Sequence, residues 1–373
     1  MKVLIISNIP SPYRIDFFNE LGKAVDLTVI FEAKLANEIK FNWNLEEIKW
    51  FKAKFLKESN IEEKKVDWSI LKYIKKNYYD VIIVTSYAYL TEMVALLTLK
   101  FKKIPYYLEI DGGLIRTDEN YFKSKLKSFL ISNAKGYFSP SKSSDDFLVY
   151  YGADREQIYR YPFTSLKRED ILNEVIQADE KSVLKKQLNI QEEKVVLSVG
   201  RFIHGKGFDV LLNACNEIGK DIGVYIVGGN PTDEYVKLKN KYNLTNVHFI
   251  GFKTKEELKN YYKAADLFVL PTRGDVWGLV INEAMCHGLP VITTDKCVAG
   301  IELIENYRNG FIVPVDHSGE LSEKMNIILE DMETKNNMSN QNLEVIRKYT
   351  IENMVNKHLE ILKVKENSKF EFI

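Results

Sequence analysis

The 373-residue sequence has little that would mark a secreted, metal-binding or nucleic-acid-binding protein. Its three cysteines, Cys215, Cys286 and Cys297, are too few and too scattered for a disulfide framework or a zinc cluster, so we expect a reducing cytoplasm. Its five histidines show no metal-ligand spacing, and we expect no bound metal. Because 52 basic residues balance 52 acidic ones, the sequence has no basic excess to indicate nucleic acid as a partner.

Long hydrophobic runs are also missing. The longest strongly apolar stretch, around Met93 to Leu99, is far shorter than the ~20 residues that span a bilayer. The apolar start of the chain, Met1 to Ser7, is too short for a signal-peptide core and is typical of a buried first strand. We therefore expect a protein that is soluble or rests on a membrane surface.

Short β-branched runs alternate with longer amphipathic segments, the pattern of parallel sheets covered by helices. In the first half the expected strands are Val3–Ser7, Leu27–Phe31, Val81–Thr85, Tyr106–Ile110 and Tyr137–Ser139. The expected helices there are Arg14–Lys23, Trp68–Lys76, Thr91–Lys100, Phe122–Ser132 and Ser143–Tyr150.

A polar linker near residues 164–190 precedes a second alternating series. Its expected strands are Val195–Val199, Val224–Val227, Val247–Ile250, Leu267–Leu270, Val291–Thr294 and Phe311–Val313. We predict an α/β protein with two doubly wound domains, residues 1–165 and 166–349. A last helix, Ile351–Lys363, lies within residues 350–373, which we expect to cross back to the first domain. Ligands of such sheets bind outside the carboxyl ends of the strands, so we expect a site in the crevice between the domains.

One candidate site follows the strand Val195–Val199. Gly200 and Gly205 let a ligand approach the backbone, Arg201 and Lys206 add two positive charges, and a helix is expected to begin near Phe208. This set suits a diphosphate, above all one whose bond is breaking. The alternative is a solvated basic turn that caps the helix.

A second candidate site follows the strand Leu267–Leu270. Asp275 lies in a loop, and Glu283 lies eight residues later in a helix expected to begin near Gly278. Eight helical residues span ~12 Å, which suits two carboxylates that hold hydroxyls at opposite ends of one long ligand. The alternative for Glu283 is a partly buried helix carboxylate that is answered by a cap.

Together the two sites resemble the retaining, family 4 glycosyltransferases of the GT-B fold, also described as glycosyl transferases group 1. The resemblance rests on Gly200, Lys206-Gly207, Gly251-Phe252, the segment from Asp275 to Pro290, and Asn309-Gly310. It implies that Arg201 and Lys206 bind the diphosphate of a nucleotide sugar, that Glu283 binds the ribose and that Asp275 holds sugar hydroxyls. The remaining donor-binding positions that it implies are Gly200, Gly205, Gly251, Phe252, Val276, Trp277, Gly278 and Leu279.

The sequence departs from the family pattern beside these acids. Asp275 stands where the family has Glu, and Val276-Trp277-Gly278 replaces the usual Gly-Phe-Gly. We expect the shorter acid and the bulky indole to lie next to the sugar and to bear on which sugar is bound.

The first half offers fewer candidates. Arg14, with Tyr13, follows the first strand and is a candidate for contact with an acceptor phosphate; the alternative is an ion pair with Asp16. Asp111 occupies the position where many relatives have a histidine that contacts the donor sugar, so the resemblance makes it a catalytic candidate. The alternative for Asp111 is a structural role in a turn.

The resemblance implies a retaining, metal-independent transferase that moves a sugar from a nucleotide diphosphate, uridine more often than guanosine, to a hydroxyl. We expect a glycan or lipid-linked acceptor in surface polysaccharide biosynthesis. Two alternatives stay open: a non-hydrolysing nucleotide-sugar 2-epimerase and a non-catalytic sugar-nucleotide-binding protein.

The segment Phe122–Leu130 is basic and amphipathic, and Lys100, Lys102 and Lys103 flank another apolar segment. Such segments bind anionic lipid, which predicts peripheral contact with the inner face of the cell membrane. The alternative is a solvated helix face.

Overall fold

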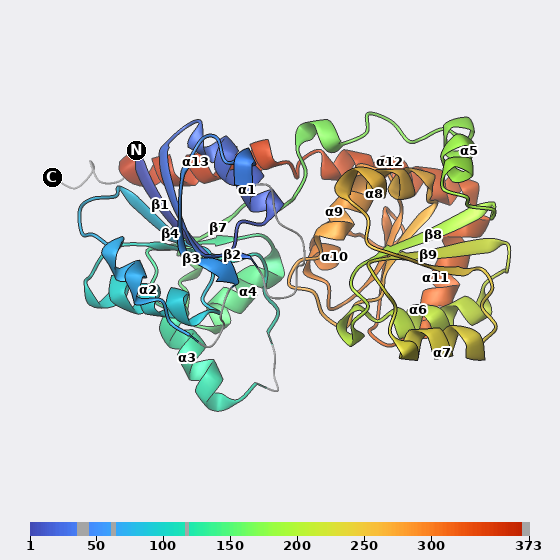
Figure 1. Ribbon diagram of the computed structural model, residues 1–373, viewed down its shortest axis with the longest axis horizontal. Coiled ribbons are helices and arrows are strands. Elements are labelled where there is room, and N and C mark those ends of the chain that lie inside the picture. The colour runs from blue at the N-terminus through green and yellow to red at the C-terminus, as the bar shows by residue number, and fades with distance from the viewer. Residues whose placement is uncertain (36–44, 61–64, 116–118, 368–373) are drawn as a thin grey trace. The chain divides into compact units, whose positions relative to one another are not determined.

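The computed structural model describes residues 1–35, 45–60, 65–115 and 119–367 of the chain. They form two compact units (Figure 1). Unit 1 comprises Met1–Ser165 together with the segment that begins at Thr350, and unit 2 comprises Leu166–Tyr349.

Unit 1 is built on a seven-stranded sheet in the order β3-β2-β1-β4-β5-β6-β7, with every pair parallel. Its strands are β1 (Lys2–Ser7), β2 (Asp26–Leu35), β3 (Lys52–Asn60), β4 (Val81–Val84), β5 (Tyr107–Glu109), β6 (Gly136–Ser139) and β7 (Ile158–Arg160). Its α-helices are α1 (Pro12–Gly22), α2 (Leu90–Phe101), α3 (Tyr121–Ile131), α4 (Lys142–Tyr150) and α13 (Ile351–Asn367).

Unit 2 is built on a six-stranded parallel sheet in the order β10-β9-β8-β11-β12-β13. Its strands are β8 (Lys194–Val199), β9 (Ile222–Val227), β10 (Val247–Ile250), β11 (Leu267–Leu270), β12 (Val291–Thr294) and β13 (Gly310–Val313). Its α-helices are α5 (Ala178–Gln187), α6 (Phe208–Ala214), α7 (Asp233–Lys241), α8 (Lys255–Ala264), α9 (Leu279–Cys286), α10 (Val298–Leu303), α11 (Ser318–Glu330) and α12 (Met332–Ile346).

The central strands are continuous apolar runs because both of their faces are covered. Val3 to Ile6 in β1 are all at most 2% exposed, and β1 pairs with β2 on one side and β4 on the other. Such runs are typical of a parallel sheet with helices on both faces, whereas a half-exposed strand would alternate. The two sheets therefore confirm the predicted α/β class with two doubly wound units.

Each sheet reverses its strand order once. The reversal falls between β1 and β4 in unit 1 and between β8 and β11 in unit 2. At such a point the connections on either side leave toward opposite faces of the sheet and open a space at the carboxyl ends of the strands. The loops that follow β8 and β11 are therefore where a ligand site is expected in unit 2.

Some predicted elements need correction. The sequence analysis missed β3 and β7, the two edge strands of unit 1, because β3 mixes lysine with apolar residues and β7 is only three residues long. The predicted helix Trp68–Lys76 is only a 3₁₀ helix, Trp68–Lys72. The predicted linker contains α5, whose Lys181 donates to Asp266 at 2.9 Å and so attaches this segment to unit 2.

Candidate functional site

Two loops of unit 2 emerge side by side at the carboxyl edge of its sheet. Loop 200–207 follows β8 and loop 271–278 follows β11, and the two strands pair directly, with Leu267 in register with Val196. These are the two predicted site loops, and they flank the point where the strand order reverses.

The two loops are fastened to each other by hydrogen bonds. The Thr272 hydroxyl and the Arg273 amide both donate to the carbonyl oxygen of Gly205, each at 2.8 Å. The Arg273 guanidinium donates to the carbonyl oxygen of His204 at 2.7 Å and pairs with Asp209 on α6. A bidentate arginine of this kind fixes geometry as well as charge, so the loops form one preorganised surface.

Gly207 allows this close approach. Its φ of +68° lies in the left-handed region, and a Cβ there would lie 1.9 Å from the carbonyl oxygen of Pro271. No side chain fits that space, so glycine is required for both conformation and contact. By contrast, a Cβ on Gly205 or Gly251 would meet no atom within 4 Å.

Lys206 and Asp275 meet across the two loops. The Lys206 ammonium lies 2.5 Å from a carboxylate oxygen of Asp275, and each side chain is about one fifth exposed. The structure therefore brings together two of the predicted catalytic side chains from positions 69 residues apart. An ammonium beside a carboxylate at an accessible edge can bind a phosphate oxygen and a neighbouring hydroxyl at the same time.

Helix α9 begins at this edge. Gly278 precedes it with a φ of +100°, and a Cβ at Gly278 would lie 2.8 Å from the sulfur of Cys297. The first amides of a helix have no acceptor within the helix, and its dipole favours an anion at this end. The start at Leu279 agrees with the predicted start near Gly278.

Glu283 lies in the second turn of α9 and is half-buried. The hydroxyl of Tyr262 on α8 donates to its carboxylate at 3.0 Å. The ring of His287 stacks on Tyr262 with centroids 5.2 Å apart, and burial lowers the pKa of His287 to about 4, so this imidazole is neutral at pH 7. The neutral ring lets Tyr262 pack closely and hold the Glu283 carboxylate in place.

The structure corrects the expectation for Trp277. Its indole is only 3% exposed, and its N–H donates to the side-chain oxygen of the buried Asn282 at 2.8 Å. The indole therefore belongs to the interior of unit 2, and the side chain that this loop presents to solvent is Val276, which is 61% exposed.

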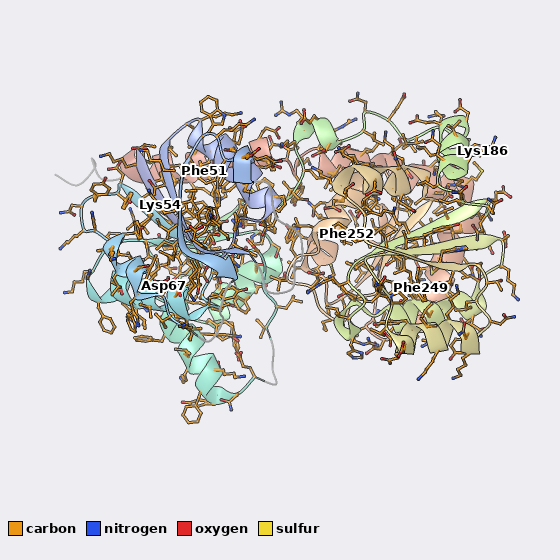
Figure 2. The ribbon with its side chains drawn as sticks, in the orientation of Figure 1. Phe51, Lys54, Asp67, Lys186, Phe249 and Phe252 are labelled. Carbon is orange, nitrogen blue, oxygen red and sulfur yellow. The ribbon has the colours of Figure 1, made fainter. Side chains whose placement is uncertain are left out.

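Two further predicted positions are exposed on unit 2. Arg201 lies at the surface of loop 200–207. The ring of Phe252, just past the end of β10, is 58% exposed (Figure 2). Their binding roles stay predictions.

In unit 1, Arg14 lies in a buried charge cluster. Its guanidinium is 3% exposed, lies 2.5 Å from Glu109 on β5, and also pairs with Asp111, whose other carboxylate oxygen accepts from the Tyr13 hydroxyl at 3.2 Å. The sequence offered Asp16 as the alternative partner of Arg14, whereas the structure pairs Arg14 with two acids that lie 95 and 97 residues away. Because both acids already engage Arg14, its acceptor role stays a prediction, and its visible contacts position Asp111.

Helix α13 completes this cluster. His358 is fully buried, lies 3.3 Å from the second carboxylate oxygen of Glu109, and stacks on Phe138 with centroids 4.4 Å apart. Burial alone would raise the pKa of Glu109, but the charge of Arg14 and the hydrogen bond with His358 outweigh it and lower the pKa to about 2. Glu109 therefore stays ionised and holds Arg14 toward Asp111.

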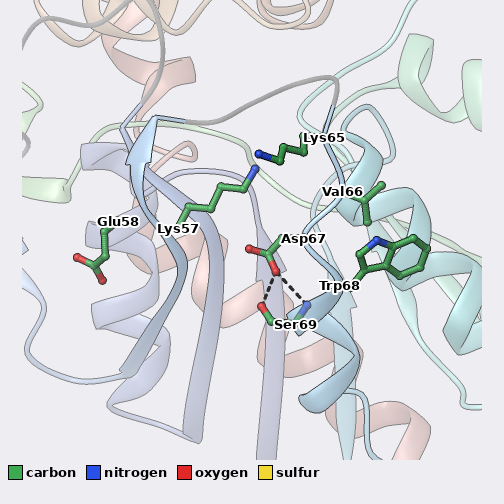
Figure 3. A pocket seen from close by; sticks show the side chains of 7 residues that line it. All are labelled: Lys57, Glu58, Lys65, Val66, Asp67, Trp68 and Ser69. Carbon is green, nitrogen blue, oxygen red and sulfur yellow. Dashed lines mark hydrogen bonds between the residues drawn. The ribbon is translucent and has the colours of Figure 1, made fainter.

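Unit 1 also has an open hollow of about 600 Å³ near the end of β3 (Figure 3). Lys57, Lys65, Asp67 and Trp68 are among its lining residues. The Asp67 carboxylate accepts from the amide and hydroxyl of Ser69, at 2.9 and 2.6 Å. The sequence analysis did not find this hollow, since it missed β3.

Within the described part of the chain, no helix is long and apolar enough to cross a membrane. In the same residues, no three histidine, cysteine, aspartate or glutamate side chains are grouped as a metal ion requires. Metal independence stays a prediction.

Comparison with known proteins identifies the class of the domain that holds these loops. Residues 180–345 match the family described as glycosyl transferases group 1, and this match contains both site loops and α9. The fold matches that of HepE from Anabaena, solved with UDP-glucose, with a TM-score of 0.76 and 17% identity over 98% of this chain and 100% of that one. The chain thus carries a glycosyl transferases group 1 domain and has the GT-B fold.

Two similar proteins have names that describe their reaction or pathway. N,N'-diacetylbacillosaminyl-diphospho-undecaprenol α-1,3-N-acetylgalactosaminyltransferase of Campylobacter jejuni is 23% identical over 69% of this chain and 70% of its own length. Amylovoran biosynthesis glycosyltransferase AmsK of Erwinia amylovora is 33% identical over 36% of each chain. The chain thus spans only about a third of the second relative. Both relatives are glycosyltransferases, and the second is named for the biosynthesis of amylovoran.

Proposed function

We propose that the protein is a retaining glycosyltransferase that moves a sugar from a nucleotide diphosphate, a uridine donor above a guanosine donor, to a hydroxyl of a glycan or lipid-linked acceptor. The observation that carries this proposal is the contact of Lys206 with Asp275 at the start of α9. The Lys206 ammonium suits the leaving phosphate, the Asp275 carboxylate suits the sugar hydroxyls, and the start of α9 at Leu279, which follows the same loop as Asp275, suits an anion.

The diphosphate binds Lys206, Arg201 and the first amides of α9. In the structure the Asp275 carboxylate pairs with the Lys206 ammonium. When a donor enters, its phosphate oxygens take over the ammonium, and Asp275 turns to the sugar hydroxyls. Positive groups placed where negative charge develops are the usual source of such catalysis, and here they supply the charge without a metal ion.

The nucleoside lies farther along α9. Glu283, which Tyr262 orients, accepts hydrogen bonds from the ribose hydroxyls. Phe252 lies at the surface past β10 and offers an apolar face to the base. The uridine preference draws support from HepE, which was solved with UDP and with UDP-glucose.

The reaction breaks the bond between the anomeric carbon and the phosphate oxygen and forms one to the acceptor oxygen on the same face. The departing phosphate takes the acceptor proton, so no enzymatic base is needed. Asp111, held by Arg14 and Tyr13, remains the candidate that unit 1 offers for a role in catalysis.

The acceptor is a saccharide carried on a lipid diphosphate. The Campylobacter relative is named for transfer to such a compound. We place the reaction at the cytoplasmic face of the membrane, because the three cysteines are free and buried, as is usual in a reducing compartment.

A panel of nucleotide sugars tests the proposal. Thermal shift identifies the donor that stabilises the purified protein, and that donor is then incubated with lipid-linked acceptors in EDTA. We expect by NMR a product with the same anomeric configuration as the donor, and we expect Lys206→Met to lower turnover on the order of 10²-fold. Lys237→Met, on α7, is the matched control and should leave turnover unchanged.

Three outcomes would reject the proposal. Near-normal turnover by Lys206→Met would remove the role of the site. Epimerised donor in the absence of acceptor would indicate a 2-epimerase. Stoichiometric nucleotide binding with neither transfer nor slow donor hydrolysis would indicate a binding protein.

A further inference from the structure

Helix α3 of unit 1 exposes its apolar face to solvent. Phe122 is 79% exposed, Leu126 is 47% exposed and Phe129 is 44% exposed. At 3.6 residues per turn these three side chains fall within about 60° of one another around the helix. The buried residues of α3 are Leu130 and Ile131, near its end. An amphipathic helix normally turns such a stripe toward a core, so this arrangement needs an explanation.

Lysines border the stripe on both sides. Lys123 and Lys125 flank it on α3, and both are exposed. The end of α2 adds Phe101, which is 73% exposed, between Lys100 and Lys102. The α2–α3 patch is our name for this set of apolar and basic side chains: Phe101, Phe122, Leu126, Phe129, Lys100, Lys102, Lys103, Lys123 and Lys125.

The two helices form one surface at the patch. The ammonium of Lys100 on α2 lies 3.3 Å from the centre of the Phe129 ring on α3. The segments 100–103 and 121–131 contain six lysines and no acidic residue. The nearby Lys127 pairs with Glu119 and leans over Tyr151, away from the stripe. The patch thus joins a row of large apolar groups to charges of a single sign.

We propose that the α2–α3 patch docks on an anionic lipid bilayer, with Phe101, Phe122, Leu126 and Phe129 inserted among the headgroups. Its chemistry selects this occupant. A helix with aromatic and leucine side chains on one face and lysines beside them is suited to the interface of a membrane, where the lysines meet anionic headgroups. An anionic lipid surface supplies negative charge along the whole patch, so no lysine needs an individually placed acidic partner.

The inference rests on the proposed function in one respect only: a lipid-linked acceptor explains why the protein binds to a membrane surface. Vesicle binding needs neither donor nor acceptor. Its failure is therefore distinct from a failure of sugar transfer, and UDP binding measured on the same samples reports on unit 2 alone.

The experiment measures sedimentation of the full chain with vesicles of phosphatidylcholine, with and without 30% phosphatidylglycerol. We expect binding to the anionic vesicles, at least tenfold weaker binding to neutral ones, and weakening with added salt. The variant Phe122→Ser/Leu126→Ser/Phe129→Ser should lose at least tenfold, as should Lys102→Gln/Lys123→Gln/Lys125→Gln. The control Val183→Ser/Val236→Ser/Met332→Ser removes exposed apolar groups from unit 2 and should bind as the natural sequence does.

Three results would overturn the inference. One is no binding of the natural sequence to anionic vesicles. Another is equal binding by the patch variants and the control. The third is that the natural sequence binds no vesicles and is a dimer in analytical ultracentrifugation, while the apolar patch variant is a monomer. That result would show that the patch is a contact between two copies of the chain. Circular dichroism and UDP binding of every variant confirm that it is folded.

Discussion

Replacing Arg14 by methionine tests how much the buried ion pair with Glu109, which also contacts His358 of helix α13, contributes to the stability of unit 1. Arg14 is 3% exposed and Glu109 fully buried, so the substitution leaves an ionised carboxylate in the core with only His358 beside it. Removing one partner of a buried ion pair typically costs about 3–5 kcal/mol. Asp111 is 31% exposed and adds less, since water can replace its lost partner.

Hydrogen exchange measures this effect separately in each unit. A loss of ~3 kcal/mol speeds exchange through unfolding by about 100-fold. We expect that acceleration in β1 and β5 of unit 1, while β8 and β11 of unit 2 serve as the internal control. The double variant Arg14→Met/Glu109→Leu removes both charges and should recover most of the loss.

The pH dependence gives an independent check. The folded-state pKa of Glu109 is lowered to about 2, so its contribution to stability is present above its ordinary pKa near 4.5 and is lost as the pH falls toward 2. Arg14→Met should lack this decline. A stability loss below about 1 kcal/mol, or an unchanged acid profile, would refute the buried-pair reasoning.

Three other predictions concern single positions. Burial raises the pKa of Glu92 to about 8, so the stability of the natural protein should fall as the pH rises from about 4.5 to 8. Glu92→Gln should remove this pH dependence, and urea denaturation at pH 8 should show it to be more stable than the natural protein. Gly207→Ala places a methyl group against a carbonyl of the facing loop at positive φ, and it should destabilise unit 2 by about 2 kcal/mol or more; Gly319→Ala, with open space in α11, is the control, and equal effects would contradict the loop geometry. Trp277→Phe should lower the free energy of unfolding by about 1–3 kcal/mol, because the indole hydrogen bond is lost, and should leave the affinity for UDP unchanged. A large loss of UDP affinity without a loss of stability would show instead that the indole contacts the ligand.

The sequence predicts the sheets well where strands are buried on both faces. β8, β11 and β12 lie within one residue of their expected bounds, because short runs of apolar or β-branched residues between turn signals are typical of strands buried on both faces. Edge strands are harder, since β3 has a neighbour on one side only and two of its lysines, Lys52 and Lys54, are exposed. The predicted helix that begins at Trp68 ends early as a 3₁₀ turn, which local sequence does not reveal.

The sequence predicts which loops form the site, but it does not predict which side chains contact one another there. The glycines and charges that follow β8 and β11 indicate where the loops lie. Tyr262 reaches Glu283 from another helix, and Arg14 reaches Glu109 across 95 residues; no spacing rule indicates such contacts. The orientation of Trp277 depends on a buried amide that only the packed structure places beside it.

The central claim is that the loops after β8 and β11, with α9, bind one nucleotide diphosphate. Isothermal titration of UDP into the natural protein, Glu283→Ala and the exposed-helix control Glu330→Ala tests it most directly. The account predicts one site per chain, at least tenfold weaker binding by Glu283→Ala, and unchanged binding by Glu330→Ala. Equal affinity of all three proteins for UDP would contradict it.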